Sequence, residues 1–325
     1  IIRTKTSLAK VYLLNHKADE AKRYVDDVLK SDPNDAEAHF LKGNIFMAGG
    51  DPSAAIAEYK IVADARPQLM AAQIRLAEAY AANKDFTSAV DILQNTLKTK
   101  PNSREVLRSL GRILTKAEDY KQAEAQYRLI LDKSPNDLEV KADLGDLFLT
   151  AKDYKRAEAE YTDIKKTVPG NALGYAKLGE YYSERKNWAA ATDELEQAVK
   201  LAPQSAPLYN LLVRAYTEQG KYPDAIATCE SHIRANPNDA LSYNLLGQIY
   251  ARQKNFEKAN GAFQKAISIQ PLWPVPINNL AKLYLDNGMK DAAVKKFEEA
   301  IRTNPNNLIA YLSLGQVYEQ SKDYQ

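Results

Sequence analysis

The sequence predicts an all-α solenoid made of nine full helical hairpins and a truncated tenth. Two observations predict it. Nine of the fourteen prolines, from Pro33 to Pro305, stand at an unbroken spacing of 34 residues. Within that period, small and bulky apolar residues recur at helical spacing. A fixed period of this length indicates that one helical unit is repeated along the chain.

The repeats are placed by counting the recurring proline as position 32. They then begin at residues 2, 36, 70, 104, 138, 172, 206, 240, 274 and 308. The last repeat ends after its first helix, and the chain starts without Met inside the first repeat. We therefore expect residues 1–325 to form a single array that belongs to a longer protein.

The first helix of each repeat is predicted by an apolar stripe at positions 4, 7, 8 and 11. Position 7 is Leu in nine of ten repeats and fails only at Lys42. Position 8 is Gly or Ala except at Val213, and position 11 is Tyr or Phe except at Leu114. The small residue at position 8 would let a second helix approach closely.

The second helix is predicted by a stripe at positions 20, 24 and 27. Position 20 is Ala in all nine repeats that reach it, and position 24 is mostly bulky, as at Tyr161 and Phe263. Short polar turns such as residues 219–222 would fold the two helices into a hairpin. We expect the small side chains at positions 8 and 20 to lie at close helix crossings, with the bulky ones around them.

The joint between repeats is predicted at the proline, because proline lacks an N–H and disfavours helix at the preceding residue. In the stretch 236–239 (Asn-Pro-Asn-Asp), the residues that follow Pro237 can cap the next helix. Asn238 and Asp239 are the candidates, so one helix ends and the next begins within a few residues.

This 34-residue pattern resembles the tetratricopeptide repeat family, whose signature combines the small residues at positions 8 and 20, the aromatic at position 11 and the proline at position 32. The resemblance covers residues 2–325. It implies a right-handed superhelix whose first helices line a concave groove. It also implies a scaffold that binds other proteins.

Composition excludes several classes of function. Net charge is only +2 and is shared evenly by the two halves of the chain, so we expect no nucleic-acid partner. No apolar run approaches the roughly 20 residues that a membrane-spanning helix needs. The composition fits the cytoplasm or the periplasm, and we expect a bacterial source.

No residue pattern predicts catalysis. The three histidines are scattered, no metal-binding or phosphate-binding motif is present, and Cys229 is the only cysteine. Cys229 and His232 occupy core positions 24 and 27, so both are expected to pack between helices. The sequence therefore predicts neither an enzyme nor a cofactor or metal site.

A binding surface is predicted on the first helices of repeats 7 to 9. Asn210, Asn244 and Asn278 share position 5, and Asn279 follows the last of them. A primary amide can both donate to and accept from the backbone of an extended peptide, and Asn has little reason to sit inside a helix. The surrounding residues predicted to join this site are apolar at position 2 and polar or basic at position 9: Leu241, Val275, Arg214, Gln248 and Lys282. The alternative is that the three asparagines reflect only similarity between adjacent repeats.

A second, apolar surface is predicted on repeats 1 to 3. Leu13, Leu14, Phe40, Met47 and Ile74 fall at groove positions of the first helices, beside Lys10 and Asn44. Such a patch would bind a partner or a segment of chain that precedes residue 1. We favour the preceding segment, because terminal repeats need capping.

The predicted function is a non-catalytic scaffold that holds an extended peptide or partner protein in its concave groove. The alternative is the targeting arm of a larger enzyme or of a bacterial secretion or polysaccharide-export assembly. Self-association through the terminal repeats is a further possibility.

Overall fold

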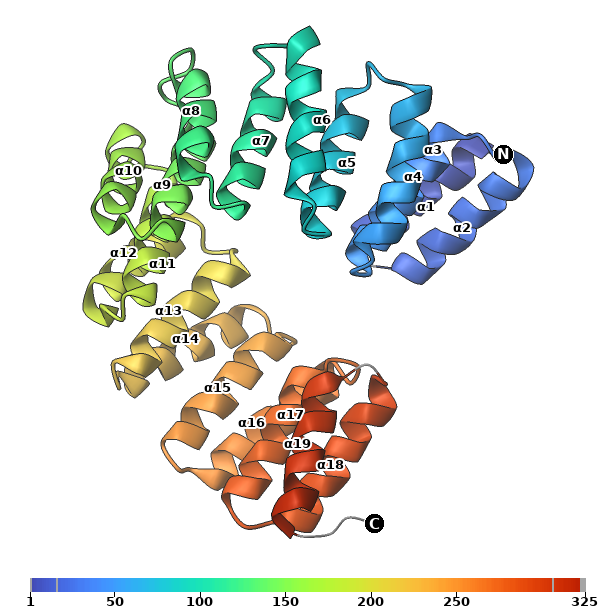
Figure 1. The fold of residues 1–325 in the computed structure, drawn as a ribbon. Coiled ribbons are helices and arrows are strands. Elements are labelled where there is room, and N and C mark those ends of the chain that lie inside the picture. Colours follow the sequence, from blue (N-terminus) through green and yellow to red (C-terminus); the bar gives the residue numbers. More distant parts are fainter. Residues whose placement is uncertain (1, 16, 306, 322–325) are drawn as a thin grey trace. The chain divides into compact units, whose positions relative to one another are not determined.

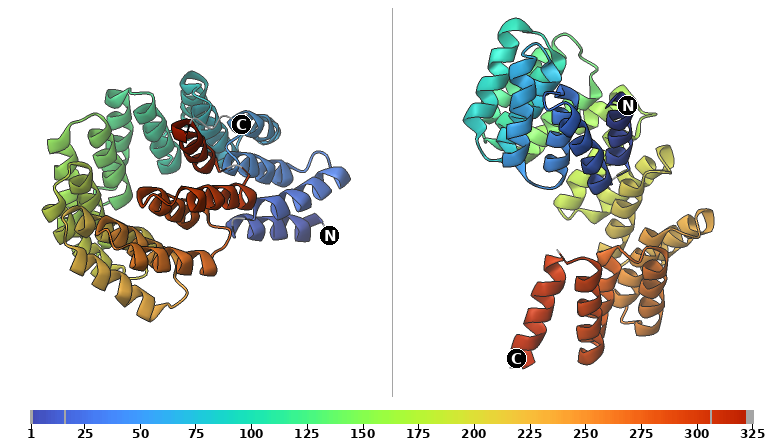
Figure 2. Two further views of the ribbon diagram at one scale, coloured as in Figure 1. Left: turned by 90° about the horizontal axis from the view of Figure 1, so that it is seen from below. Right: turned by 90° about the vertical axis from the view of Figure 1, so that its right-hand side faces the viewer.

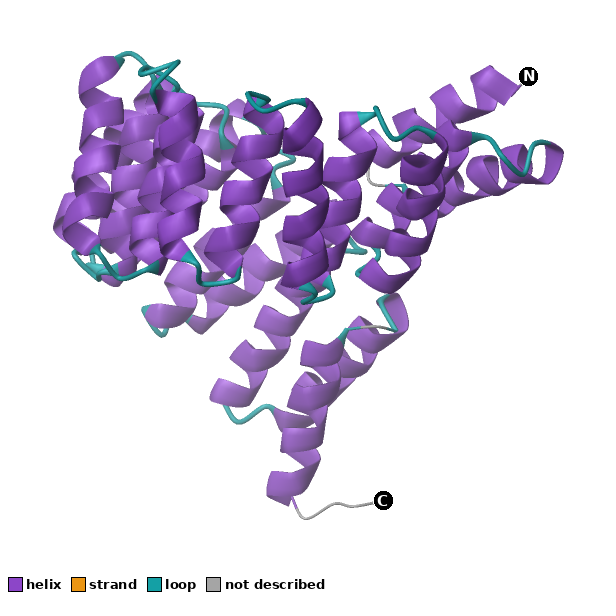
Figure 3. Cartoon of the chain, turned by 45° about the horizontal axis from the view of Figure 1, so that its top comes forward, coloured by secondary structure: helices purple, strands orange, loops and turns teal. Residues whose placement is uncertain are grey.

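A computed structural model of the chain describes residues 2–15, 17–305 and 307–321. In these ranges it contains nineteen α-helices and no strand (Figures 1 and 3). The helices belong to two compact units, residues 1–169 and 170–325, and each unit is described by itself. The single array over residues 1–325 therefore stays a prediction.

The first unit contains ten helices: α1 (Ile2–Leu14), α2 (Ala18–Ser31), α3 (Ala36–Ala48), α4 (Pro52–Ala65), α5 (Met70–Ala82), α6 (Phe86–Thr99), α7 (Arg104–Lys116), α8 (Tyr120–Leu131), α9 (Leu138–Thr150) and α10 (Tyr154–Thr167). The second unit contains the remaining nine: α11 (Ala172–Glu184), α12 (Trp188–Leu201), α13 (Ala206–Glu218), α14 (Tyr222–Ala235), α15 (Ala240–Arg252), α16 (Phe256–Ile269), α17 (Pro274–Asp286), α18 (Lys290–Thr303) and α19 (Leu308–Ser321).

The odd-numbered helices begin at the predicted repeat starts, and each of them except α19 packs antiparallel against the even-numbered helix that follows it. Each even-numbered helix also packs against the first helix of the next repeat within its unit. Hairpins α15/α16 and α17/α18, for example, lie side by side in the second unit (Figure 2). The all-α repeat fold is confirmed.

The close crossings predicted at positions 8 and 20 are confirmed, because the alanines at position 20 are completely buried and the glycines at position 8 lie against the side chains at position 24. A Cβ added to Gly111 would lie 2.6 Å from Cε1 of Tyr127, and one added to Gly179 would lie 2.5 Å from Cγ of Leu195. Both distances are shorter than real Cβ contacts, so the partner side chain occupies the space that a larger residue would need. The glycines let a bulky side chain from the second helix lie against the backbone of the first.

The departures from the pattern are accommodated locally. Val213, the one large residue at position 8, lies in the same core cluster as Cys229, the smallest residue at position 24. Lys42, which replaces Leu at position 7, places its Nζ 2.8 Å from a carboxylate oxygen of Glu58 and 5.9 Å from the centre of the Phe46 ring. In each case the neighbours supply what the unusual side chain requires.

The joint between repeats 7 and 8 is also as predicted. Asp239 caps α15, because its Oδ1 accepts a hydrogen bond of 3.1 Å from the backbone N–H of Leu241. Asn238 does not form this cap. Similar caps at Asp35, Asp137 and Asn171 start other first helices.

Candidate functional site

The predicted site on repeats 7 to 9 presents four exposed polar side chains on the first helices of its repeats. We call this set the polar row, and its members are Asn210 and Arg214 on α13, Gln248 on α15 and Lys282 on α17. Val275 is 39% exposed beside it, and Leu241 is half-buried. These six predicted residues are accessible or partly accessible to a ligand.

The other predicted asparagines hold neighbouring helices together. Asn244 is only 2% exposed, and its Oδ1 accepts a hydrogen bond of 2.9 Å from Nδ2 of Asn279. Asn278 exchanges longer hydrogen bonds of 3.3 and 3.4 Å with Asn307, which caps α19. Asn244, Asn278 and Asn279 therefore link α15, α17 and α19, and their contact with a peptide stays a prediction.

The predicted apolar surface of repeats 1 to 3 coincides with a cavity of about 790 Å³ in the first unit. Leu13, Leu14, Phe40 and Met47 line it, and Leu14 is 81% exposed. Ile74 is half-buried and is not among the lining residues. The predicted polar neighbours also line the cavity: Lys10 and Asn44.

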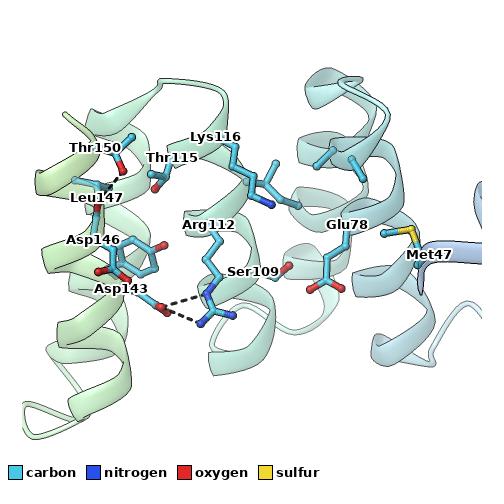
Figure 4. Close-up of a pocket in the computed structure, with 14 residues that line it drawn as sticks. Met47, Glu78, Ser109, Arg112, Thr115, Lys116, Asp143, Asp146, Leu147 and Thr150 are labelled. Carbon is cyan, nitrogen blue, oxygen red and sulfur yellow. Dashed lines mark hydrogen bonds and ion pairs between the residues drawn. The ribbon is translucent and has the colours of Figure 1, made fainter. Parts of the chain in front are cut away.

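A second cavity of the first unit was missed by the sequence reasoning. Its volume is about 560 Å³, and we call it the charged cavity (Figure 4). Helices α5, α7 and α9 supply its charged residues: Glu78, Arg112, Lys116, Asp143 and Asp146. The signal that could have revealed it is position 9 of repeats 3 to 5, where Glu78, Arg112 and Asp146 alternate in charge.

One wall of the charged cavity belongs to a network of ion pairs between α7 and α9. Arg104 donates to Asp137 at 2.5 and 2.9 Å and to Glu139 at 3.0 Å. The hydrogen bond from Arg104 holds the pKa of the Asp137 carboxyl below its usual range. Arg108 pairs with both Glu139 and Asp143. The network fixes the two helices side by side and pairs Asp143, its one carboxylate that lines the cavity, with two arginines.

Ser109, on α7, also lines the charged cavity, and its hydroxyl has no hydrogen-bond partner in the described part of the chain. The residue is 7% exposed. An unpaired buried polar group costs about 1–3 kcal/mol of stability, so native proteins keep few of them. Such a group often marks a place where an absent molecule supplies the partner.

The polar groups around His232 do not form a catalytic arrangement. The Nδ1 atom of His232 is 2.7 Å from Asp239, and Ser242 donates to the same carboxylate. The serine hydroxyl is completely buried, and the histidine ring stacks on Tyr209 at 4.3 Å. A serine nucleophile would need to be accessible to a substrate and to donate to the histidine, so these residues serve the joint between repeats.

The single thiol is equally unsuited to chemistry. Cys229 is completely buried, and burial raises its pKa to about 12, so it is a neutral thiol near pH 7. Among the described residues no group of three or more His, Cys, Asp and Glu is placed to hold a metal ion. Nor does any helix in this part of the chain combine the length and apolar character that crossing a bilayer requires.

Comparison with solved structures gives several similar chains. A structure of MamA is 29% identical, covering 50% of this chain and 95% of its own, with a TM-score of 0.42. A tetratricopeptide repeat protein from Parabacteroides merdae ATCC 43184 is 20% identical, covering 77% of this chain and 98% of its own, with a TM-score of 0.48. Yeast Tom70 is 16% identical, covering 99% of this chain and 89% of its own, with a TM-score of 0.45. No curated protein sequence matches the chain.

The family models are decisive. Models described as tetratricopeptide repeat match residues 6–69, 46–113, 114–180, 183–249, 240–273 and 278–325. The matches extend over most of the chain and cover the repeated helices described above. Proteins of this family typically mediate protein–protein interactions. This chain belongs to the tetratricopeptide repeat family.

Proposed function

We propose that this protein is a non-catalytic scaffold that binds an extended segment of a partner protein along the first helices of repeats 7 to 9. The observation that carries the proposal is the polar row, Asn210, Arg214, Gln248 and Lys282, which is exposed on three successive first helices of one unit. A helix face that serves only packing would not need these residue types.

The chemistry of the row suits an extended peptide. Asn210 and Gln248 offer amides that donate to and accept from a peptide backbone, whatever its sequence. Arg214 and Lys282 add two positive charges, which favour a segment that carries carboxylates. Val275, exposed at the edge of the row, adds apolar contact for one or two side chains of the ligand.

The other predicted asparagines, Asn244, Asn278 and Asn279, have a supporting role. The hydrogen bond between Asn244 and Asn279 and the pair between Asn278 and Asn307 hold α15, α17 and α19 in register behind the row. A rigid set of donors loses less conformational entropy when a ligand binds. These asparagines would therefore contribute to binding through the position of the row.

The test selects peptides from a phage-displayed random library on the full chain and measures their affinity for two variants. The first variant carries Arg214→Glu and Lys282→Glu in the polar row. The matched control carries Lys200→Glu and Lys295→Glu, two exposed lysines on second helices of the same unit. Both variants change the net charge equally, so a general charge effect would appear in both.

Selected peptides should bind the control as they bind the wild-type chain and should lose roughly tenfold or more in affinity for the row variant. Melting temperatures of the two variants should agree, because all four positions are exposed. Equal affinities for the two variants would remove the site from the polar row.

A further inference from the structure

A second binding site lies in the first unit, on helices that do not carry the polar row. One cavity is lined by Glu78 from α5, by Ser109 and Arg112 from α7, and by Asp143 and Asp146 from α9 (Figure 4). The guanidinium of Arg112 turns toward Asp143. Lys116 extends from the last turn of α7 into the same cavity. Three successive first helices therefore contribute to one hollow.

The charges of the hollow alternate from one repeat to the next. Position 9 is acidic in α5 (Glu78), basic in α7 (Arg112) and acidic again in α9 (Asp146). Lys116, one turn beyond Arg112, is exposed and adds a second positive charge above α7. A segment that runs across these helices meets negative, positive and negative charge in turn.

The central positive charge is held in place by the protein. Arg112 donates from Nε and Nη2 to Oδ1 of Asp143, at 3.2 and 2.8 Å. The Asp143 side chain is 9% exposed and is fixed further by Arg108, whereas that of Arg112 is 52% exposed. The guanidinium is therefore oriented by a buried carboxylate while much of its surface stays open to a ligand.

Each flanking acid accepts a hydrogen bond from a neighbouring side chain. Glu78 accepts a hydrogen bond of 2.8 Å from Arg75, and its side chain is 35% exposed. Asp146 accepts one of 2.6 Å from the hydroxyl of Tyr161. Fixed charges lose little conformational freedom when a ligand binds, which favours recognition.

Ser109 supports a binding site independently of the charges, because its hydroxyl is unbonded among the described residues. Ser109 lies one turn before Arg112 on α7 and lines the same cavity, and its buried hydroxyl lacks a partner in the described chain. It can donate to a carbonyl or carboxylate oxygen and can accept from an N–H. A backbone or side chain of a bound segment would satisfy it.

We propose that the charged cavity binds an extended polypeptide segment in which an acidic side chain lies between two basic ones. The acidic side chain would pair with Arg112 and Lys116, and the basic side chains would face Glu78 and Asp146. Packed helices lie roughly 8–10 Å apart, and an extended chain rises about 3.3 Å per residue. The charges of the ligand should therefore recur about every three residues.

The experiment uses the full chain and two synthetic peptides measured by fluorescence anisotropy. One peptide has the core Lys-Gly-Ser-Glu-Gly-Ser-Lys, and the other has the reversed core Glu-Gly-Ser-Lys-Gly-Ser-Glu. The first should bind at least roughly tenfold more tightly, and its affinity should fall as salt is raised. Equal affinities, or a preference for the reversed peptide, would overturn the proposal.

Two pairs of variants test the residues. Lys116→Glu should weaken binding of the first peptide roughly tenfold, whereas Lys121→Glu, an exposed lysine on α8, should leave it unchanged. The double variant Glu78→Lys with Lys116→Glu should shift the preference toward the reversed peptide. If Lys116→Glu and Lys121→Glu lowered the affinity for the first peptide equally, binding would depend only on the net charge, and the proposed site would be wrong.

Ser109→Ala separates a binding role from a structural one. Its melting temperature should be no lower than that of the wild-type chain, since the hydroxyl makes no bond to lose. Affinity for the first peptide should nevertheless fall roughly fivefold, about what one hydrogen bond contributes. Unchanged affinity would remove Ser109 from the site. The variant Arg214→Glu with Lys282→Glu should leave this binding intact, so failure here and failure at the polar row can be told apart.

Discussion

At the scale of single residues, each hairpin depends on a small side chain at position 8 and a larger one at position 24. Gly111 and Tyr127 illustrate the rule, because the ring occupies the space where a side chain on the glycine would lie. In repeat 7 the order is reversed: position 8 carries the larger Val213 and position 24 the smaller Cys229, so the combined volume of the two side chains stays moderate. The pair, more than either residue, is what the fold requires.

We expect Gly111→Ala to lower the free energy of unfolding by about 1–3 kcal/mol, because the new methyl group would force the ring of Tyr127 out of its place. Gly261→Ala is the matched control. A Cβ on Gly261 meets no atom within 4 Å, so this change should stabilise α16 by about 0.5–1 kcal/mol. Urea denaturation followed by circular dichroism measures both. A stable Gly111→Ala variant would contradict the close crossing.

At the scale of elements, the turn between the two helices of a hairpin has one recurrent backbone feature. Position 15 adopts a positive φ in eight repeats. Three of these positions are glycine, at Gly50, Gly220 and Gly288, with φ between 74 and 76°. The other five carry a side chain, as at Lys152 with φ of 61°. Because left-handed backbone is strained for residues other than glycine, the turn stores a small cost wherever glycine is absent.

We expect Gly220→Ala to lower the free energy of unfolding by about 1 kcal/mol, because alanine is strained in the left-handed backbone. Lys152→Gly should raise it by about 0.3 kcal/mol or more, since glycine removes the strain. Lys155→Gly, an exposed position in the first turn of α10, should instead lower the free energy of unfolding by up to about 1 kcal/mol, because glycine disfavours helix. Thermal melts of the three variants measure these changes in stability. The same sign for Lys152→Gly and Lys155→Gly would show that the turn is not strained.

At the scale of the whole molecule, the buried tyrosines at position 24 couple stability to alkaline pH. Tyr59 is 1% exposed, and burial raises the pKa of its hydroxyl from 10 to about 12. Burial likewise raises the pKa of Tyr127, farther above its usual value. In the unfolded chain these hydroxyls lose their protons near pH 10, whereas in the folded chain they keep them.

The folded state therefore binds more protons than the unfolded state between pH 10 and about 12, and its stability falls as the pH rises through this window. Below pH 10 the two states bind the same number at these groups, and the stability is fully present. Denaturant titrations at pH 8 and pH 11 should give a lower midpoint at pH 11. The variant Tyr59→Phe should show a smaller loss between the two values, and an equal loss would exclude Tyr59 as a contributor.

The sequence by itself determined the repeat, the starts of the helices and the close crossings. These features follow from periodicity within 34 residues, so each repeat predicts the next one. It also identified the exposed members of the polar row and most of the apolar surface of repeats 1 to 3, because groove positions follow from the same register.

Only the tertiary structure decided which of three identical residues at one position is accessible. Asn210 is exposed, whereas Asn244 is buried against Asn279 and Asn278 is paired with Asn307. The partner of Asn244 lies 35 residues away in the following repeat, whereas the partner of Asn278 lies 29 residues away at the end of the same repeat. The unpaired hydroxyl of Ser109 was hidden for the same reason: a hydrogen bond that is missing is a property of the packed surroundings and cannot be read from a column of the repeat.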